Sequence, residues 1–350
     1  MDIQFQFPKR VAVFLLGNVC FGFYLANKIH FSFGLLHSVF ASLVLITGFG
    51  EMQLYPYAYW SACTMFSLWF IDIDRKWQHF VLRSIALVGI VVAVHALLQV
   101  FGFVWPLTFA EGVAVKPIAF MGQQTKLGAY LAPISALCLS LGWVIPALFV
   151  AFIALMTGSS FTAMALAAGL AVSARFYYGR KATSLVVAIG IVSAIGLYAL
   201  KPFHGPFAFH GRDRVWIDAL EAIKKSPIVG YGPGSFKQIF DVQFESKETA
   251  ETFGHFREAH NDYIQCLFEF GLVGLLSLFV ALFYVAKSFK AYWKIDYTSL
   301  EVRSCLAMLA ALLVNALGNF PAELAPHFLF MVFSGAVVLR ATREVDFGSY

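Results

Sequence analysis

The fold is decided by residues 127–174, LGAYLAPISALCLSLGWVIPALFVAFIALMTGSSFTAMALAAGLAVSA, which contain no Asp, Glu, Lys or Arg. Runs of 18 or more apolar residues predict membrane-spanning helices, and about 20 residues are needed to cross a bilayer. The stretch is long enough for two helices of about 24 residues or three of about 16. The polar interruption Thr157-Gly158-Ser159-Ser160 favours three helices.

The whole chain has the composition of a membrane protein. Of its 350 residues, 60% are hydrophobic and 13% are charged, and the mean hydropathy is +0.74. Soluble domains carry about 25% charged residues, so this chain has too little charge to cover a soluble globule of its size. A soluble enzyme, a disordered chain and a small disulfide scaffold are therefore excluded. The five cysteines show no metal-ligand spacing, and the net charge of +5 does not indicate nucleic-acid binding.

Further apolar runs predict the other membrane spans. We expect these spans at about residues 11–27, 31–50, 55–71, 80–104, 183–200, 263–286, 304–320 and 326–340. The expected fold class is an all-α polytopic membrane protein with about 10–12 transmembrane helices. Because no internal repeat or linker is visible, residues 1–350 are interpreted as a single integral membrane domain.

One polar island, residues 201–262, holds more than a third of the charged side chains. Lys and Arg in short loops mark the cytoplasmic side of a membrane protein. Three basic clusters fall on one side when the island faces the other: Arg175, Arg180 and Lys181, then Lys287, Lys290 and Lys294, then Arg340 and Arg343. We therefore expect the island to be a large extracytoplasmic loop and the C-terminus to be cytoplasmic. Eleven spans would place the N-terminus outside, whereas Lys9 and Arg10 favour ten.

The island also contains the residues that could carry chemistry. Arg212 precedes a helix-like stretch at 216–225, and Pro227 ends this stretch because proline cannot continue the helical hydrogen bonds. A glycine-rich turn follows, but it lacks the Lys-Ser/Thr of a phosphate-binding loop. The sequence Glu258-Ala259-His260-Asn261-Asp262-Tyr263 then leads into an apolar span that contains Glu269.

The order and spacing of these residues follow a known pattern over about residues 205–280. The matching positions are Arg212, Trp216, Ala219-Leu220, Pro227, Gly230-Tyr231-Gly232, Gly234-Ser235-Phe236, His260-Asn261, Gln265, Glu269, Gly271 and Gly274. Together they resemble the bacterial O-antigen ligase and O-antigen polymerase superfamily. In that pattern an arginine stands four residues before a tryptophan, and a His-Asn pair leads into a helix with Glu-x-Gly. The resemblance implies a GT-C-like membrane glycosyltransferase that uses glycans linked to undecaprenyl pyrophosphate. It also implies a location in the bacterial inner membrane, with residues 201–262 as a large periplasmic loop that carries the active site.

Upstream, residues 120–131 and 154–160 resemble two further segments of the family. Ser160 stands where the family usually has an arginine, so a basic contact to the lipid pyrophosphate is missing. Lys126 begins an apolar helix on the same side of the membrane in the three-helix interpretation and could supply the missing charge. We expect Arg212 and Lys126 to lie on opposite sides of one pyrophosphate-sized pocket. The alternative is that Lys126 is an interfacial anchoring lysine.

The reaction that the resemblance implies gives each polar residue a role. A sugar hydroxyl is a poor nucleophile, so a base within hydrogen-bond reach assists its attack, and His260 at the membrane boundary fits that role. A pyrophosphate leaving group gathers negative charge, which arginine meets with two parallel hydrogen bonds. Arg212 and Arg214 fit this role, with Arg257 as an auxiliary.

Three residues are expected to support the site: Asn261, Glu269 and Trp216. Asn261 is also explained as a structural cap and Trp216 as a packing or interfacial aromatic. Glu269 lies inside an apolar span, where an ionisable group is a functional candidate, and it could instead pair two helices. No acidic Asp-x-Asp pair occurs in the island, so we expect a metal-independent enzyme with no cofactor.

The predicted function is therefore an O-antigen ligase that transfers a glycan from undecaprenyl pyrophosphate to a sugar hydroxyl. The expected partners are this lipid-linked donor, a saccharide acceptor (lipid A-core or a lipid-linked repeat) and membrane lipids, with no nucleic acid. An O-antigen polymerase uses the same chemistry with a different acceptor and remains open. A polysaccharide or lipid transporter remains an alternative of another class, although the paired halves with interrupted helices that are typical of transporters are not visible.

Overall fold

The computed structural model describes residues 74–103, 117–179, 212–232, 234–293, 299–319 and 324–347, together with isolated positions from 181 to 192 and at 321. The expected spans before residue 74, most of the span at 183–200 and the first part of the polar island lie outside these residues. Within the described residues the chain is helical and forms no strand, as its composition predicts.

The uncharged stretch forms three helices, which confirms the three-helix interpretation. These are α5 (Gln124–Ser140), α6 (Val144–Met156) and α7 (Ser160–Tyr178). The turns between them are made at Gly142 and Gly158, whose φ angles of 80° and 67° favour glycine. Ser159 caps α7, because its side chain accepts a hydrogen bond from the Thr162 amide at 3.3 Å.

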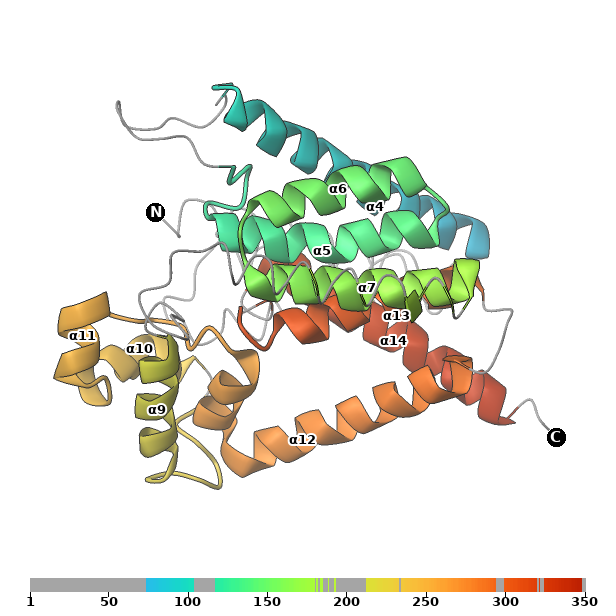
Figure 1. The fold of residues 1–350 in the computed structure, drawn as a ribbon. Coiled ribbons are helices and arrows are strands. Elements are labelled where there is room, and N and C mark those ends of the chain that lie inside the picture. Colours follow the sequence, from blue (N-terminus) through green and yellow to red (C-terminus); the bar gives the residue numbers. More distant parts are fainter. Residues whose placement is uncertain are drawn as a thin grey trace, which may run out of the picture.

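These three helices pack with α13 (Leu300–Asn315) into one bundle (Figure 1). Small residues allow close approach: a Cβ added at Gly169 would lie 2.8 Å from Ala136 Cβ and 3.0 Å from Ala311 Cβ. Buried hydroxyls also link neighbouring helices, since Ser173 Oγ donates to the Ala136 carbonyl at 2.8 Å. Small residues and hydrogen bonds between helices are typical of packing in membranes.

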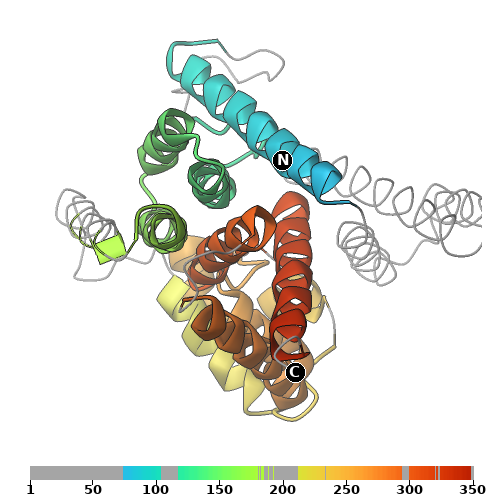
Figure 2. The ribbon, with the colours of Figure 1, turned by 90° about the vertical axis from the view of Figure 1, so that its right-hand side faces the viewer.

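Two more helices flank this bundle, α4 (Arg75–Val100) and α14 (Ala325–Phe347). Figure 2 shows the green helices α5, α6 and α7 gathered beside the red α13 and α14. In the described part of the chain, α4 and α7 are long and apolar enough to cross a membrane, and α6 and residues 326–338 form shorter apolar helices. Large apolar side chains on α4 and α6 are exposed, among them Val91 and Ile145. The helices are therefore compatible with a membrane protein.

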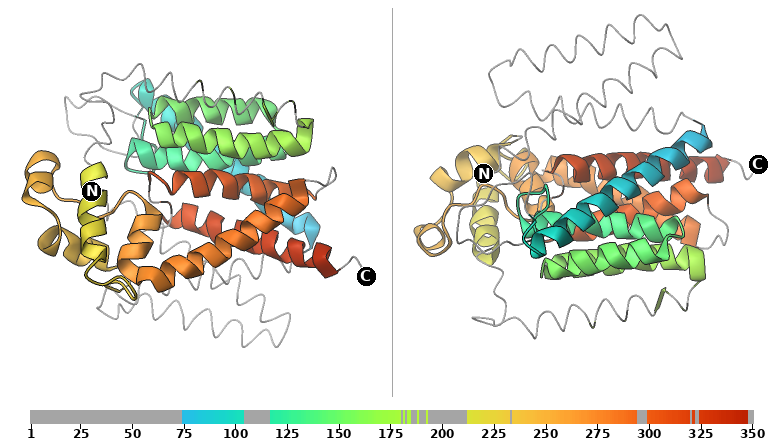
Figure 3. Two further views of the ribbon diagram at one scale, coloured as in Figure 1. Left: turned by 60° about the horizontal axis from the view of Figure 1, so that its bottom comes forward. Right: turned by 90° about the horizontal axis from the view of Figure 1, so that it is seen from above.

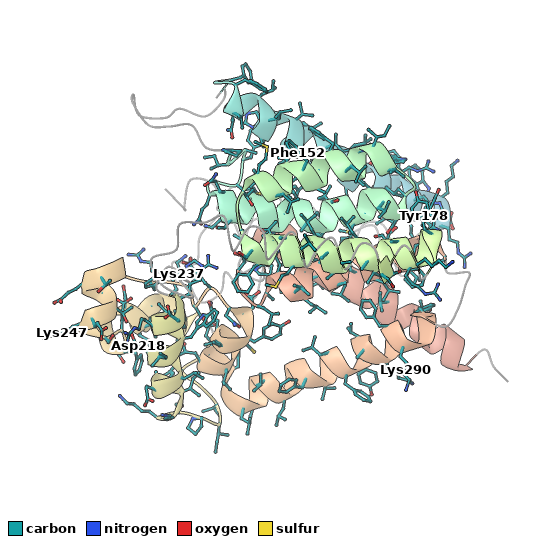
Figure 4. The ribbon with its side chains drawn as sticks, viewed as in Figure 1. Phe152, Tyr178, Asp218, Lys237, Lys247 and Lys290 are labelled. Atoms are coloured by element: carbon teal, nitrogen blue, oxygen red, sulfur yellow. The ribbon has the colours of Figure 1, made fainter. Side chains whose placement is uncertain are left out.

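The polar island folds into short helices at one end of the bundle. They are α9 (Arg212–Ile223), α10 (Ser235–Gln243) and α11 (Lys247–Phe253). Both views in Figure 3 place them beyond the same end of the bundle, and Figure 4 shows Asp218, Lys237 and Lys247 there. The sequence predicted a helix at 216–225, whereas α9 begins four residues earlier, and α10 and α11 were not predicted.

Helix α12 (Asp262–Trp293) joins the two parts of the molecule. It packs against α9 and, further along, against α14. It begins beside the short helices and runs toward the opposite end of the bundle, where Lys290 lies (Figures 1 and 4). The C-terminal end of α14 lies at that opposite end as well. The expected span at 263–286 thus corresponds to a longer helix, and this helix is broken at Gly271.

Candidate active site

The glycine-rich turn of the island closes the break in α12. At Gly271 the backbone leaves helical geometry, with φ 61° and ψ −157°, so amides and carbonyls on both sides of the break lose their helical partners. Four backbone hydrogen bonds of 2.8 to 3.1 Å replace those partners. They run from Tyr231 N to Phe268 O, from Gly232 N to Glu269 O, from Leu272 N to Pro227 O and from Val273 N to Ile228 O.

Glycine is required on both sides of this contact. Gly230 has φ 68°, and a Cβ there would lie 2.6 Å from the Glu269 carbonyl carbon and oxygen. A Cβ at Gly271 would likewise collide with the Ile228 carbonyl. The Gly-x-Gly turn and the Glu-x-Gly helix of the motif therefore fit together as one joint between the island and α12.

The carboxylate of Glu269 forms further hydrogen bonds inside this joint. Glu269 is buried, and its Oε2 accepts a hydrogen bond from the Gly234 amide at 2.9 Å, just before α10 begins. Its Oε1 accepts from Gln265 Nε2 at 3.4 Å. Gln265 Oε1 in turn accepts from the Ala259 amide at 3.2 Å. Glu269 is thus connected through Gln265 to the residue before His260.

His260 is held in an uncommon backbone conformation. Its φ of 53° lies in the left-handed region, which costs a non-glycine residue free energy and is seen mainly where surrounding contacts enforce it. Trp216 enforces it on one side, because its indole Nε1–H donates to the Ala259 carbonyl at 2.7 Å. Asn261 enforces it on the other: its Oδ1 accepts from the amides of Tyr263 and Ile264, at 3.0 and 3.1 Å, and so caps the start of α12.

The turn that follows α13, residues 316–318, is the segment against which the site is assembled. Three groups from the island bind its carbonyls. The Asp262 amide donates to Ala316 O at 3.0 Å, Asn261 Nδ2 donates to Leu317 O at 3.1 Å, and Arg212 Nη1 donates to Gly318 O. Arg212, Asn261 and the backbone around His260 therefore contact one short segment directly after α13.

Lys126 approaches the same place from the bundle. It lies in the first turn of α5 and is only 6% exposed. The first turn of α5 contains no acidic residue, and a cation near the positive end of a helix dipole is unfavourable unless an anion is near. Asn315, the last residue of α13, fixes α5 beside the site because its Nδ2 donates to the Ala129 carbonyl at 3.0 Å.

Two positive charges from different parts of the chain act on His260. The pKa of His260 is lowered from 6.5 to about 3, first by burial and then by the positive charges of Arg212 and Lys126. Its imidazole is therefore neutral near pH 7. The structure thus brings His260, Arg212 and Lys126 together at the end of the bundle, with Trp216, Asn261 and Glu269 holding the surrounding backbone.

The other two arginines lie apart from this group. Arg214 Nη2 pairs with Glu248 Oε1 of α11 at 3.1 Å, and both side chains are exposed. Arg257 is an exposed residue of the segment before His260. Successive positions of a helix are rotated by about 100°, so residues 212 and 214 of α9 point in nearly opposite directions.

Several residues that build the site were missed by the sequence reasoning. Gln265 was noted only as part of the motif, and Asn315 and Asn319 of the α13 end were not noted at all. Asn319 Nδ2 donates to Asn315 Oδ1 at 2.6 Å, and both side chains are buried. Two amides four residues apart near the end of an apolar span would have been a usable indication, because buried polar groups in such spans have partners.

A metal site does not emerge from the described part of the chain. No group of three or more His, Cys, Asp and Glu side chains among those residues could hold a metal ion. The expectation that the protein needs neither metal nor cofactor stays a prediction.

The described residues thus form an apolar helical bundle with a partly buried histidine at one end, on which two cations act. Residues 145–279 match a family model described as O-Antigen ligase. The match runs from α6 to the middle of α12 and includes Arg212 and His260 but not Lys126. This match confirms the resemblance predicted from the motifs.

One similar protein is an uncharacterized protein of Haemophilus influenzae. It is 33% identical over 82 residues, which are 22% of this chain and 21% of the relative. The matched segment thus spans about a fifth of the relative's length, and the name of the relative assigns no activity.

Proposed function

We propose that this protein is a membrane glycosyltransferase of the O-antigen ligase type. It would transfer a glycan from undecaprenyl pyrophosphate to a sugar hydroxyl at the periplasmic face of the inner membrane. The observation that carries the proposal is that the charges of Arg212 and Lys126 both act on His260, in a chain whose residues 145–279 match the O-antigen ligase family model. A neutral imidazole beside two cations offers a proton acceptor and an anion site in one place.

The proposed reaction is a single displacement at the first sugar of the glycan. The acceptor hydroxyl attacks the anomeric carbon, and the bond from this carbon to the pyrophosphate oxygen breaks. The hydroxyl proton moves to the imidazole of His260, and the bonding electron pair leaves with undecaprenyl pyrophosphate. Positively charged side chains stabilise the charge that develops on the leaving group, which is a large contribution in sites with little water.

Arg212 and Lys126 are the residues that we assign to the leaving group. Arg212 already binds the Gly318 carbonyl, which fixes its guanidinium, and Lys126 is buried in the first turn of α5. One cation alone would neutralise a pyrophosphate poorly in a partly dry site. Ser160, at the position of the family's second arginine, begins α7 at the same end of the bundle. Arg214 is left out of the proposal because it pairs with Glu248.

Donor binding should also activate the base. A pKa of about 3 makes the free imidazole a weak proton acceptor, because a general base works best with a pKa near the working pH. The charges of Arg212 and Lys126 contribute to that low pKa. A bound pyrophosphate would offset them, and the pKa of His260 would rise. The base would therefore become effective once the donor is in place.

Deleting the gene in its host tests the proposal. If the protein is a ligase, capped lipopolysaccharide disappears from a gel and polymer accumulates on the lipid carrier. Core that carries a single repeat unit would instead identify a polymerase. A normal surface polysaccharide with normal lipid-linked intermediates would contradict both.

A reconstituted assay tests the chemistry directly. The purified protein in proteoliposomes, given lipid-linked glycan and acceptor in buffer with EDTA, should form product and release undecaprenyl pyrophosphate. Activity that returns only after magnesium or manganese is added would contradict the metal-independent part of the proposal. Movement of glycan across the membrane without bond transfer would identify a transporter.

A further inference from the structure

The turn that closes the break in α12 exposes apolar side chains where a loop in water would carry polar ones. Ile228 and Val229 are 64% and 67% exposed. Ile228 lies beside the break in α12, because its carbonyl accepts a hydrogen bond from the Val273 amide, and an exposed apolar stripe of α12 begins there. The members of that stripe are spaced three or four residues apart or adjacent, and they are Leu272, Val273, Leu276, Phe279, Val280 and Phe283.

The backbone fixes the depth of this turn relative to α12. The amides of Leu272 and Val273, the first two residues of the stripe, donate to the carbonyls of Pro227 and Ile228 at 2.8 and 3.1 Å. If the stripe of α12 faces lipid, Ile228 lies at the level where the stripe begins. Irregular backbone is tolerated near lipid only where its polar groups have protein partners, and the four hydrogen bonds of this joint supply such partners.

The charges beside the turn also fit a membrane surface. Lys224 and Lys225 are exposed and stand four and three residues before Ile228. The Lys225 ammonium lies 5.6 Å from the centre of the Phe244 ring, and Lys224 pairs with Glu221. Lysines next to buried apolar groups extend to the lipid phosphates, where anionic headgroups attract them.

We propose that residues 224–229 form a membrane-surface anchor. Ile228 and Val229 insert into the lipid surface on the side of the active site, and Lys224 and Lys225 contact anionic headgroups. The inference rests on the proposed membrane transferase, because α12 must face lipid. The anchor holds the joint between the island and α12 at the membrane surface. Within this joint Glu269 binds Gln265, and Gln265 binds the Ala259 amide next to His260. The anchor therefore also sets the distance of His260 from the lipid surface.

Lipid quenching of a fluorescent label tests the anchor. Single cysteines are introduced as Ile228→Cys, Val280→Cys and Val242→Cys in a protein whose five native cysteines are replaced by alanine and that still complements the gene deletion. Each variant is labelled with an environment-sensitive fluorophore. It is then reconstituted into vesicles of phosphatidylethanolamine and phosphatidylglycerol that contain a lipid with a nitroxide either near the headgroup or on its acyl chain.

The two other positions are matched controls. Val280 belongs to the α12 stripe and is 57% exposed, whereas Val242 is 80% exposed at the end of α10 that lies away from the glycine-rich turn. The label at 228 should lose fluorescence to the headgroup nitroxide, and the label at 280, about 12 Å further along the helix, should lose fluorescence to a lipid with the nitroxide on its acyl chain. Its quenching by aqueous iodide should be several-fold weaker than at 242.

Each other outcome contradicts a stated part of the inference. A label at 228 that is quenched by iodide and not by lipid means that the turn faces water. Protection from both quenchers means that protein covers the turn, either another segment or a second molecule. If the label at 280 also escapes the lipid nitroxide, the membrane placement of α12 fails, and the proposed membrane transferase fails with it.

Discussion

The bundle and the polar island are stabilised by different kinds of packing. The core of the bundle is rich in small residues, and a glycine such as Gly169 is in contact range of Ala136 and Ala311. The core of the island is built from large aromatic rings. Phe236 stacks on Phe240 with ring centres 4.2 Å apart, and both rings contact Phe268 of α12.

In the proposed membrane placement, the difference reflects the solvent that each region meets. Apolar side chains gain little by leaving lipid, so helices in a membrane associate through close contact of small residues and through hydrogen bonds. A loop in water gains free energy by burying large apolar surfaces, and aromatic rings bury the most. The two packing types meet at the break in α12 and at the end of α13. The candidate site lies where they meet, since Lys126 belongs to the bundle and His260 belongs to the island.

Replacing His260 by alanine, at the boundary between the two regions, should lower the transfer rate more than any other substitution. We expect transfer in proteoliposomes to fall by about 10²–10⁴-fold, the usual contribution of general acid–base catalysis. His255→Ala is the matched control, since that exposed histidine of the same segment pairs with Glu245 at 2.7 Å. A His260→Ala protein that keeps more than about a tenth of the wild-type rate would contradict the role of base.

Replacing either cation tests whether Lys126 of the bundle and Arg212 of the island stabilise the same leaving group. Lys126→Gln and Arg212→Gln should each lower kcat by about 10²–10³-fold, as loss of one stabilising donor does elsewhere. Arg214→Gln removes an exposed arginine that pairs with Glu248, and it should change kcat less than about twofold. A Lys126→Gln protein with the rate of the Arg214→Gln control would show that Lys126 is only an interfacial lysine.

Substituting a glycine in the joint between the island and α12 should destabilise the island more than the bundle. Gly271→Ala combines φ 61° with a collision at the Ile228 carbonyl, so we expect a loss of about 2 kcal/mol or more in thermal stability. Gly254→Ala meets similar backbone strain, at φ 79° and ψ 179°, but has open space around it, so it should cost less stability than Gly271→Ala. Limited proteolysis should cleave the island of the Gly271→Ala protein first. Equal melting temperatures for the two variants would disprove the close fit at the joint.

Glu269→Gln should have a small effect, because the carboxylate holds backbone and side-chain amides. A glutamine keeps one oxygen for the Gly234 amide, so we expect a loss of about 1 kcal/mol and at most about a fivefold change in rate. Glu269→Ala should cost more stability because the Gly234 amide loses its acceptor. A drop in kcat of the size seen for His260→Ala, with unchanged melting, would assign Glu269 a direct catalytic role.

The smallest expected effect is that of pH on kcat/KM, which reports the free enzyme. An unperturbed imidazole with pKa 6.5 would be about 97% protonated at pH 5, whereas His260 with a pKa of about 3 stays neutral. The kcat/KM should therefore show no histidine titration from pH 8 to pH 5. The kcat, which reports the donor complex, should fall at low pH because bound pyrophosphate raises the pKa. A decline of kcat/KM centred near pH 6.5 would contradict the burial of His260.

The same pKa shift has a consequence for stability. The unfolded chain binds a proton at this histidine near pH 6.5 and the folded protein only near pH 3. Between these values the unfolded state holds more protons, so the contribution of His260 lowers stability progressively as the pH falls. A His260→Gln variant should lose less stability than the wild type between pH 7 and pH 4, as measured by thermal melting.

Some features of the site were predictable and others were not, for local reasons. The polar residues 157–160 and two glycines in an uncharged stretch indicate helix ends, so three helices could be predicted. The break in α12 could not, because an isolated glycine in a helical pattern is compatible with an unbroken helix. Arg214 was a further candidate for the leaving group because it stands two residues after Arg212, but the directions of the two side chains differ once the segment becomes helical.

The sequence by itself determined that this chain is an apolar helical protein with one polar island, and it placed Arg212 and His260 in the motif of the O-antigen ligase family. These properties depend on composition and short spacing, which do not require knowledge of distant contacts. Only the tertiary structure decided that Lys126 lies beside His260, that Arg214 turns toward Glu248 and that the glycine turn closes the break in α12. Those arrangements depend on how α5 and α12 pack against the end of α13, and local sequence carries no information on such long-range contacts.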